Sequence, residues 1–324
     1  MNAPRVAVFR AWSVPTTLFA GSLALAVSLV PAHRLPELWR QPADIGTLAM
    51  AMTAIIMTAG IDLSVGSTVA LAGIVLGLLY RDLSWPIWLA AVGAIAGGAA
   101  AGSANGLLVA AGIAPLVATL ATMALYAGLA MALVNGERIK DLPDSFTWIG
   151  QQSLGGLPCS VWLLVGVAIL YFVLVHHTWI GRSLFAIGEN RLAAEFAAIP
   201  VRRIEFWLYV ACGTVAGLVA VMQSALRASA IPDAARGFEL QAIACVVLGG
   251  TRVTGGFGSI GRTLLGVGTL ANLQIGLRNL GYRDLTVPGL GWRLSFDANV
   301  QMIVIGVLVI AVAIANERLA APRR

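Results

Sequence analysis

Asp62 is the only residue with a formal charge between Asp44 and Arg81, in a stretch that is otherwise almost wholly apolar. An ionised carboxylate at bilayer depth costs at least about 2.5–3.5 kcal/mol, so it persists only where it faces protein, water or a helix end. Two glycines, Gly60 and Gly66, bracket it, and two nearby serines offer hydrogen bonds. This pattern predicts a break between two membrane helices. A second interpretation stays open, in which a short surface loop uses Asp62 as the N-cap of the next helix.

The other residue types that bind metals or act as nucleophiles are not grouped for either chemistry. Cys159, Cys212 and Cys245 are far apart and lack the paired spacing of a metal or redox motif. His176 and His177 are adjacent, so on a helix they point about 100° apart and do not chelate one ion. The sequence also contains no H-E-x-x-H motif. We therefore predict no metal site, no catalytic residues and no enzyme activity for this chain.

Two nucleotide-binding motifs were considered for this sequence: the dinucleotide motif G-x-G-x-x-G and the Walker A motif. Residues Gly256–Gly261 fit G-x-G-x-x-G, but a dinucleotide fingerprint needs a βαβ unit, and the neighbours here are membrane-length apolar segments. Tight backbone turns account better for these glycines. A Walker A lysine precedes Ser or Thr, whereas the only lysine, Lys140, precedes Asp141. No cofactor is expected on this chain, and ATP with Mg²⁺ would have to bind a separate subunit.

The composition places these residues in a lipid bilayer. The 324-residue chain is 59% hydrophobic and only 11% charged, whereas a soluble domain carries about 25% charged residues. The net charge of +6 comes almost entirely from arginines scattered among loops and the two ends. Nucleic-acid surfaces show basic clusters instead. We predict an all-α integral membrane protein that does not bind nucleic acid.

Ten apolar segments approach the roughly 20 residues that a spanning helix needs. They are Trp12–Val30, Ile45–Gly60, Val65–Leu79, Pro86–Ala111, Leu116–Val134, Val161–Val175, Phe206–Leu226, Leu240–Gly250, Thr263–Leu277 and Val300–Ala315. Arg5 and Arg10 precede the first, which we interpret as an uncleaved transmembrane helix. The eighth is too short to cross alone, so it extends through its flanks or is a broken helix. With ten helices both termini share one side, and their arginines favour the cytoplasm.

Two patterns suggest how these helices repeat and pack. The second and eighth segments each end in glycine and are followed by a polar break and a Gly-Ser step (Gly66-Ser67 and Gly258-Ser259), which suggests an internal duplication. Between Gly93 and Gly106, small residues recur at spacings that let membrane helices approach closely. Asn105 lies near the end of this stretch. It either caps the helix or reaches the interior, and capping is the favoured interpretation.

A charged loop separates the sixth and seventh apolar segments. It offers an N-cap at Asn190 and then one or two helical turns, which Pro200 ends. Leu192, Phe196 and Ile199 fall at i, i+4 and i+7 and form one apolar stripe. The stripe can pack on the protein's own helices or dock into a groove on another protein. The residues alone leave both open.

Five motifs follow one another in order along the chain: Gly60–Gly66; Asn105–Leu107 with Ala114–Thr122; Gly181–Asn190; Phe238–Ile243; and Val246–Thr251 with Gly255–Ser259. This order resembles the ribose-type (simple-sugar) permease subunits of bacterial ABC importers. Gly136–Pro143 and Ala198–Val201 look most like the rhamnose and autoinducer-2 permeases. Two features depart from the pattern: Arg252 and Arg262 bring charge into the Gly-rich stretch, and residues 281–299 are longer and more polar than expected.

The resemblance implies one transmembrane permease domain over residues 1–324, with about ten helices in the bacterial inner membrane. Residues 178–205 would be a cytoplasmic loop with a coupling helix that docks on an ABC ATPase. The other partners would be a second permease chain, identical or related, and a periplasmic sugar-binding protein. The implied coupling residues are Glu189, Asn190, Arg191, Leu192, Glu195, Phe196 and Ile199.

The same resemblance implies import of a monosaccharide or related small sugar. The translocation path or helix junction would comprise Asp62, Ser64, Asn105, Thr119, Thr122, Glu239, Gln241, Gly249 and Gly250. Asp62 either pins the junction or lines the path and accepts sugar hydroxyls, and we favour the pin. The alternatives are a branched-chain amino acid ABC permease and an ion-coupled secondary transporter. In the secondary transporter, Asp62 would carry the proton, with Glu239 as the second candidate.

Overall fold

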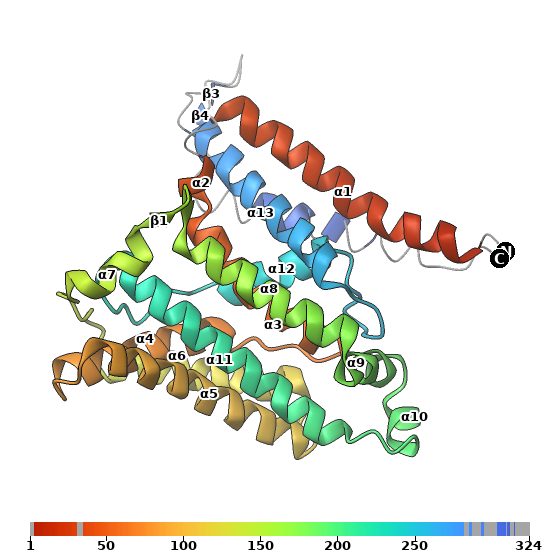
Figure 1. Cartoon of the computed structure of the whole chain (residues 1–324), viewed down its shortest axis with the longest axis horizontal. Coiled ribbons are helices and arrows are strands. Elements are labelled where there is room, and N and C mark those ends of the chain that lie inside the picture. The colour runs from red at the N-terminus through yellow and green to blue at the C-terminus, as the bar shows by residue number, and fades with distance from the viewer. Residues whose placement is uncertain are drawn as a thin grey trace.

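Helices make up about three quarters of the part of the chain that the structure describes (Figure 1). This computed structural model describes residues 3–30, 35–281, 285–286, 293–294, 303–308, 310–311 and 314. The long helices are α1 (Ala3–Leu29), α3 (Arg40–Met57), α5 (Ile87–Ala110), α6 (Pro115–Ala132), α8 (Cys159–His177), α11 (Val201–Arg227) and α13 (Ile260–Gly281). The shorter ones are α2 (Leu35–Leu38), α4 (Val65–Arg81), α7 (Asp144–Gln151), α9 (Trp179–Glu189), α10 (Arg191–Phe196) and α12 (Phe238–Leu248).

Two short antiparallel strand pairs accompany the helices. Strand β1 (Ser153–Leu154) pairs with β2 (Leu157–Pro158), and β3 (Leu285–Thr286) pairs with β4 (Arg293–Leu294). The predicted polar segment 281–299 lies largely outside the described residues, as does part of the tenth predicted segment. The other nine predicted segments each coincide with a helix.

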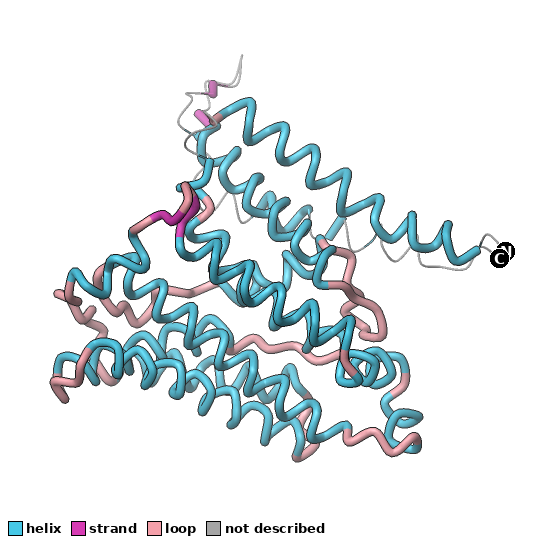
Figure 2. The backbone as a smooth tube through the Cα atoms, viewed as in Figure 1, coloured by secondary structure: helices cyan, strands magenta, loops and turns pink. Residues whose placement is uncertain are grey.

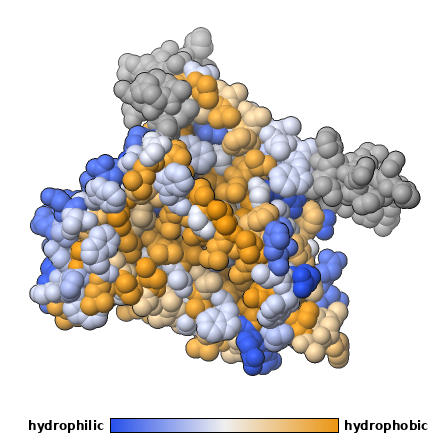
Figure 3. Space-filling view, viewed as in Figure 1, coloured by the Kyte–Doolittle hydropathy of each residue, from blue (hydrophilic) through white to orange (hydrophobic). Residues whose placement is uncertain are grey.

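Within the described residues, five helices are long and apolar enough to cross a membrane: α1, α5, α6, α8 and α11. Many of their outward side chains are large and apolar, such as Leu125 on α6 and Leu170 on α8, which are 55% and 61% exposed. In the space-filling view, hydrophobic residues cover the middle of the visible face and hydrophilic residues gather toward its two sides (Figure 3). This distribution fits a protein whose middle lies in lipid. The prediction of a helical membrane protein is confirmed.

Helices α4 and α12 begin inside the bundle. They contain 17 and 11 residues, which corresponds to about 26 and 17 Å of helix, less than the ~30 Å apolar thickness of a bilayer. Non-helical residues 58–64 and 228–237 lead into them (Figure 2). Their first turns meet where the Glu239 carboxylate and the Ala235 carbonyl lie against Gly66. The predicted break before α4 and the predicted shortness of α12 are both confirmed.

Helices α5 and α11 touch through four glycines, Gly98, Gly102, Gly213 and Gly217, which we call the glycine seam. A Cβ placed on Gly98 would lie 2.9 Å from the Gly217 nitrogen, and one on Gly213 would lie 2.8 Å from the Gly102 Cα atom. The two backbones are therefore in direct contact. On α5 this confirms the close packing predicted from the small residues between 93 and 106.

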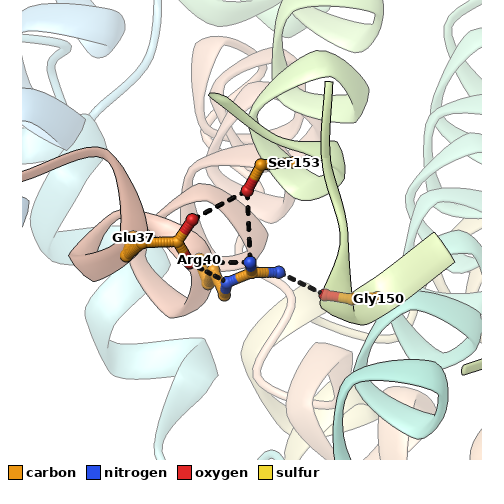
Figure 4. Close-up of polar contacts among 4 residues, drawn as sticks. All are labelled: Glu37, Arg40, Gly150 and Ser153. Carbon is orange, nitrogen blue, oxygen red and sulfur yellow. Dashed lines mark hydrogen bonds and ion pairs between the residues drawn. The ribbon is translucent and has the colours of Figure 1, made fainter. Parts of the chain in front are cut away.

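The two ends of the bundle differ, and we call them the α7 end and the α10 end after the helices that lie there (Figure 1). At the α7 end Arg40 donates to Glu37 Oε2 at 2.8 Å, to the Gly150 carbonyl at 2.6 Å and to Ser153 Oγ at 3.3 Å. Ser153 Oγ also donates to Glu37 Oε1 at 2.7 Å. This Arg40 clamp ties the start of α3 to α7 and the first hairpin (Figure 4). The Ser153 hydrogen bond, with Arg40 beside it, holds the pKa of Glu37 below its ordinary value.

Candidate functional site

Asp62 lies in the break between α3 and α4, and its side chain is enclosed by protein. It is 2% exposed, and its Oδ1 accepts hydrogen bonds from the Ser64 nitrogen at 2.9 Å and from Ser64 Oγ at 2.7 Å. Ser64 Oγ in turn accepts from Asn105 Nδ2 at 2.7 Å. Ser64, not Asp62, occupies the N-cap position of α4. The interpretation of Asp62 as the N-cap of α4 is therefore wrong, and the carboxylate is buried among three helices.

Helices α6 and α11 close around the same break. Thr119 on α6 donates to the Ile61 carbonyl at 3.2 Å, and Tyr209 on α11 donates to the same carbonyl at 3.4 Å. The Cys212 side chain, also on α11, lies beside Asp62. The break is therefore held by polar side chains from α5, α6 and α11. Sequence reasoning missed Tyr209 and Cys212, because one tyrosine and one cysteine in an apolar run resemble ordinary core residues.

The prediction that Asn105 caps the end of its helix is wrong. Helix α5 continues to Ala110, so the Asn105 backbone has helical neighbours on both sides. Its side chain is 1% exposed and points to Ser64. The apolar residues after Asn105 extend the helix, and the amide instead satisfies a buried hydroxyl.

Two further predicted path residues, Thr122 and Glu239, lie near the break without joining its hydrogen bonds. Thr122 is buried one turn beyond Thr119 and donates to carbonyls of its own helix at 3.1 and 3.2 Å. Glu239 lies in the first turn of α12, where its Oε1 accepts from the Gly237 nitrogen at 3.2 Å. A carboxylate at this position also interacts favourably with the positive end of the helix. Glu239 therefore links the first turns of the two short helices.

The remaining predicted path residues lie on α12 and in the turn that follows it. Gln241 accepts a hydrogen bond from Gln274 on α13 at 2.8 Å. Gly249 packs against the first turn of α13, where an added Cβ would lie 2.7 Å from the Arg262 carbonyl oxygen. Gly250 has a positive φ of 74° and turns the chain after α12. Gln241 and Gly249 therefore contact α13, and Gly250 forms the turn after α12.

At the α10 end, the predicted cap and part of the predicted stripe are present. Asn190 Oδ1 accepts from the Ala193 nitrogen at 3.0 Å and caps α10. Leu192 is 65% exposed and Phe196 is 85% exposed, while Ala194 faces the protein. Two large apolar side chains therefore project from this short helix.

Ile199 does not belong to the exposed pair. Helix α10 ends at Phe196, and Ala198 follows with a positive φ of 59°. A left-handed residue followed by Pro200 turns the chain away from the helix axis, so Ile199 packs against the core instead. The predicted stripe of three residues is correct for two of them.

The charged residues of this region connect α10 to α11. Arg191 forms an ion pair with Glu205 on α11 and a longer one, at 3.4 Å, with Glu195. Glu205 is only 4% exposed, whereas the Arg191 side chain is about half exposed. Arg191 therefore reaches from the surface helix to a buried carboxylate one helical turn before Tyr209.

Three backbone segments interlock beside α10. The Gly256 nitrogen donates to the Met57 carbonyl at 3.0 Å, and Gly188 at the end of α9 lies against both residues. Gly256 has a φ of +72°, so the interpretation of this glycine as a tight turn is confirmed. Residues around Glu189 and Tyr209 line a cavity of about 250 Å³ between this interlock and the Asp62 break.

The two arginines that depart from the family pattern share one aromatic ring. The Arg252 and Arg262 guanidinium carbons lie 5.0 and 4.3 Å from the Phe257 ring centroid. Cation–π contacts at this distance are attractive. The Gly-rich turn thus accommodates its positive charges against an aromatic side chain.

Comparison with known proteins identifies the family. Residues 37–313 match the family described as "Branched-chain amino acid transport system / permease component". The chain belongs to this permease family. It is 37% identical over 262 residues to the ribose import permease protein RbsC of Escherichia coli (strain K12), covering 79% of this chain and 81% of that protein. It is also 37% identical over 244 residues to the autoinducer 2 import system permease protein LsrD of Klebsiella pneumoniae subsp. pneumoniae, covering 73% of each. No solved structure matches this permease.

These relatives confirm the resemblance to ribose-type and autoinducer-2 permeases that the motifs indicated. The permease is a multi-pass membrane component of an import system and not an enzyme.

Proposed function

We propose that this permease is the membrane-spanning subunit of an ATP-driven importer in the bacterial inner membrane, and that its cargo is a monosaccharide or related small sugar. The observation that carries the proposal is the similarity to a ribose import permease over about four fifths of both chains. A cytoplasmic ATPase would bind ATP and Mg²⁺, a periplasmic binding protein would deliver the sugar, and a second permease chain would complete the path. The ten-helix count and the internal duplication belong to this proposal.

The α10 end is the proposed ATPase contact, and residues 178–205 would therefore lie in the cytoplasm. Leu192 and Phe196 present an exposed apolar pair on a capped helix, the form that helix-in-groove docking uses. Glu189, Asn190, Arg191 and Glu195 would surround this pair, and Ile199 would support it from the core side.

The described contacts offer a route from α10 to the Asp62 break. Force on α10 would act on α11 through the Arg191–Glu205 ion pair, and Tyr209 on the next turn of α11 contacts the break. It would also act on α3 through the interlock at Gly188 and Met57. In this proposal Asp62, Ser64, Asn105 and Thr119 pin the helix junction that moves. The sugar would pass nearby without a tight site, and the binding protein would supply most of the specificity.

Transport by the reconstituted complex tests the proposal. The permease, its ATPase and its binding protein should import labelled D-ribose or a related sugar into proteoliposomes only when ATP is present. Uptake of leucine in place of sugar would support the branched-chain amino acid alternative. Uptake driven by a proton gradient without the ATPase would support a secondary transporter.

A further inference from the structure

A second cavity lies on the other side of the junction of α4 and α12. Its volume is about 300 Å³, and it is bounded by α4, α6 and the turn that precedes α12. This volume is at the lower end of the ~300–1,000 Å³ range of small-molecule sites. The cavity therefore suits a small ligand.

The lining has one charged wall and one apolar wall. Asp233, Arg236 and Glu239 form the charged side, while Met123 and Met131 on α6 face it. Asp233 and Arg236 are exposed, and within the described residues neither side chain makes a hydrogen bond or an ion pair. Three charged groups thus border a cavity, and two of them have no bonded partner in the described protein.

This pairing of walls matches the two faces of a polyhydroxylated carbon skeleton. Carboxylates accept hydrogen bonds from hydroxyl groups, and a guanidinium donates to hydroxyl oxygens. The C–H face of such a molecule is apolar and can pack against methionine side chains. The charged wall holds two carboxylates for one guanidinium, so it is rich in acceptors, which suits a ligand with many hydroxyl donors.

Ser67 and Glu239 connect the cavity to the region of the Asp62 break. Ser67 lines the cavity, is 9% exposed, and donates to the Ser64 carbonyl at 2.8 Å. Glu239 lines it as well and lies against Gly66 between the first turns of α4 and α12. A relative movement of these two helices would therefore change the shape of the cavity.

We propose that this cavity is a transit site that holds one neutral, polyhydroxylated molecule of five or six carbons during import, with Asp233 and Arg236 as its hydrogen-bonding residues. The inference rests on the proposed transport function and assigns the substrate class to a place in this chain. Binding is weak because the site is open, and we expect a Kd of about 1 mM, which corresponds to roughly −4 kcal/mol.

Cysteine protection tests the site in the full chain, reconstituted in lipid. Ala127, which is exposed and lines the cavity, is replaced in a Cys159→Ser, Ala127→Cys variant. The two remaining native cysteines, Cys212 and Cys245, are buried. D-Ribose at roughly ten times a millimolar Kd should slow alkylation by N-ethylmaleimide by up to about tenfold. L-Leucine should not slow it.

Matched variants test whether the protection by D-ribose arises in this cavity. Asp82→Cys, exposed at the end of α4 and outside the cavity, should react at the same rate with and without D-ribose. Adding Arg236→Gln or Asp233→Asn to the Ala127→Cys variant should abolish the protection. The proposal is overturned if D-ribose gives no protection, if leucine protects equally, or if protection survives both substitutions.

Uptake by the otherwise unchanged complex separates the two proposals. ATP-dependent D-ribose import without protection at Ala127→Cys would reject the transit site and leave the proposed function intact. Leucine import without sugar import would reject the proposed function itself.

Discussion

At the scale of single residues, Asp62 shows how a membrane protein keeps a buried carboxylate. One oxygen accepts both hydrogen bonds from Ser64, and Asn105 and Cys212 complete the surroundings from α5 and α11. The carboxylate therefore orders the backbone between two helices. Its enclosure agrees better with a pin at the junction than with a group that contacts passing sugar.

Substitution of Asp62 distinguishes the two roles. Asp62→Asn keeps the size and one acceptor, so we expect normal assembly and retained sugar uptake. Asp62→Ala leaves the Ser64 donors unsatisfied, and we expect a loss of about 1–3 kcal/mol in the free energy of unfolding. Uptake and stimulated ATPase activity are measured in proteoliposomes. If Asp62→Asn abolishes uptake while assembly and ATPase stimulation are unchanged, Asp62 lines the path instead.

A second prediction at the scale of residues concerns the stability that the Arg191–Glu205 ion pair contributes. Arg191→Gln leaves the buried Glu205 carboxylate unpaired, whereas the double variant with Glu205→Gln removes both charges. Because an unpaired buried charge is worse than no pair, we expect Arg191→Gln to be destabilised by roughly 1–3 kcal/mol and the double variant to recover part of this loss. A double-mutant cycle by denaturation in mixed micelles measures the coupling. Additive effects would show that the two side chains act independently.

At the scale of elements, the glycine seam determines how α5 and α11 pack. Gly98→Ala would place a methyl group against the α11 backbone, while Gly97→Ala on the same helix meets only Val75 atoms at 3.7 Å or more. Both changes gain up to about 1 kcal/mol in helix propensity, but only Gly98→Ala has a steric cost of roughly 1–3 kcal/mol.

We therefore expect Gly98→Ala to reduce the yield and melting temperature of the folded permease, and Gly97→Ala to leave them unchanged or raised. Thermal unfolding monitored by size-exclusion chromatography provides the measurement. Equal behaviour of the two variants would mean that the seam is looser than the structure describes.

Helix α10 is the second element that carries a prediction. Leu192→Glu with Phe196→Glu removes the exposed apolar pair without disturbing buried residues, so the permease should fold but lose its ATPase subunit on purification. The control is Leu154→Glu, a residue that is 48% exposed at the α7 end. Retention of the ATPase by the α10 variant would reject this docking surface.

The helices could be predicted from sequence because long apolar runs leave few alternatives in a membrane. The elements that were not predicted lie outside those runs: α2, α7, α9 and the two strand pairs β1–β2 and β3–β4. Gly155 and Gly156 form the turn of the β1–β2 hairpin with φ values of 59° and 80°, a signal that the sequence did carry. In the candidate site, Asp62 and Asn105 could be recognised from the sequence because they are polar residues in apolar runs. Tyr209 and Cys212 could not, because only the fold places their side chains beside the break.

At the scale of the whole molecule, the α7 end is fastened by side chains while the α10 end presents an apolar pair. Glu37 in the Arg40 clamp has a pKa below 4.5, so its charged form is stabilised by folding. This contribution is fully present above pH 4.5 and is lost as the pH falls through the lowered value. Because the group is largely exposed, we expect an effect of less than about 1 kcal/mol.

Ser153→Ala tests this clamp. It should lower the melting temperature slightly at pH 7, and the difference from the unchanged protein should shrink below pH 4.5. Ser103→Ala, whose hydroxyl bonds only within its own helix among the described residues, is the control and should show no such pH dependence. A difference that persists at low pH would mean that Ser153 does not act through Glu37.

The partners of Asp62 also have a consequence for biosynthesis. Asn105 follows Asp62 by about 40 residues, on α5, but Tyr209 and Cys212 are made about 150 residues after Asp62. At a synthesis rate of about 5–20 residues per second, roughly 7–30 seconds pass between the synthesis of Asp62 and the synthesis of its neighbours on α11. A nascent chain that stops before α11 therefore holds its break together with α5 and α6 alone. We expect such truncated chains to be cleared by membrane quality-control proteases sooner than chains that end after α11.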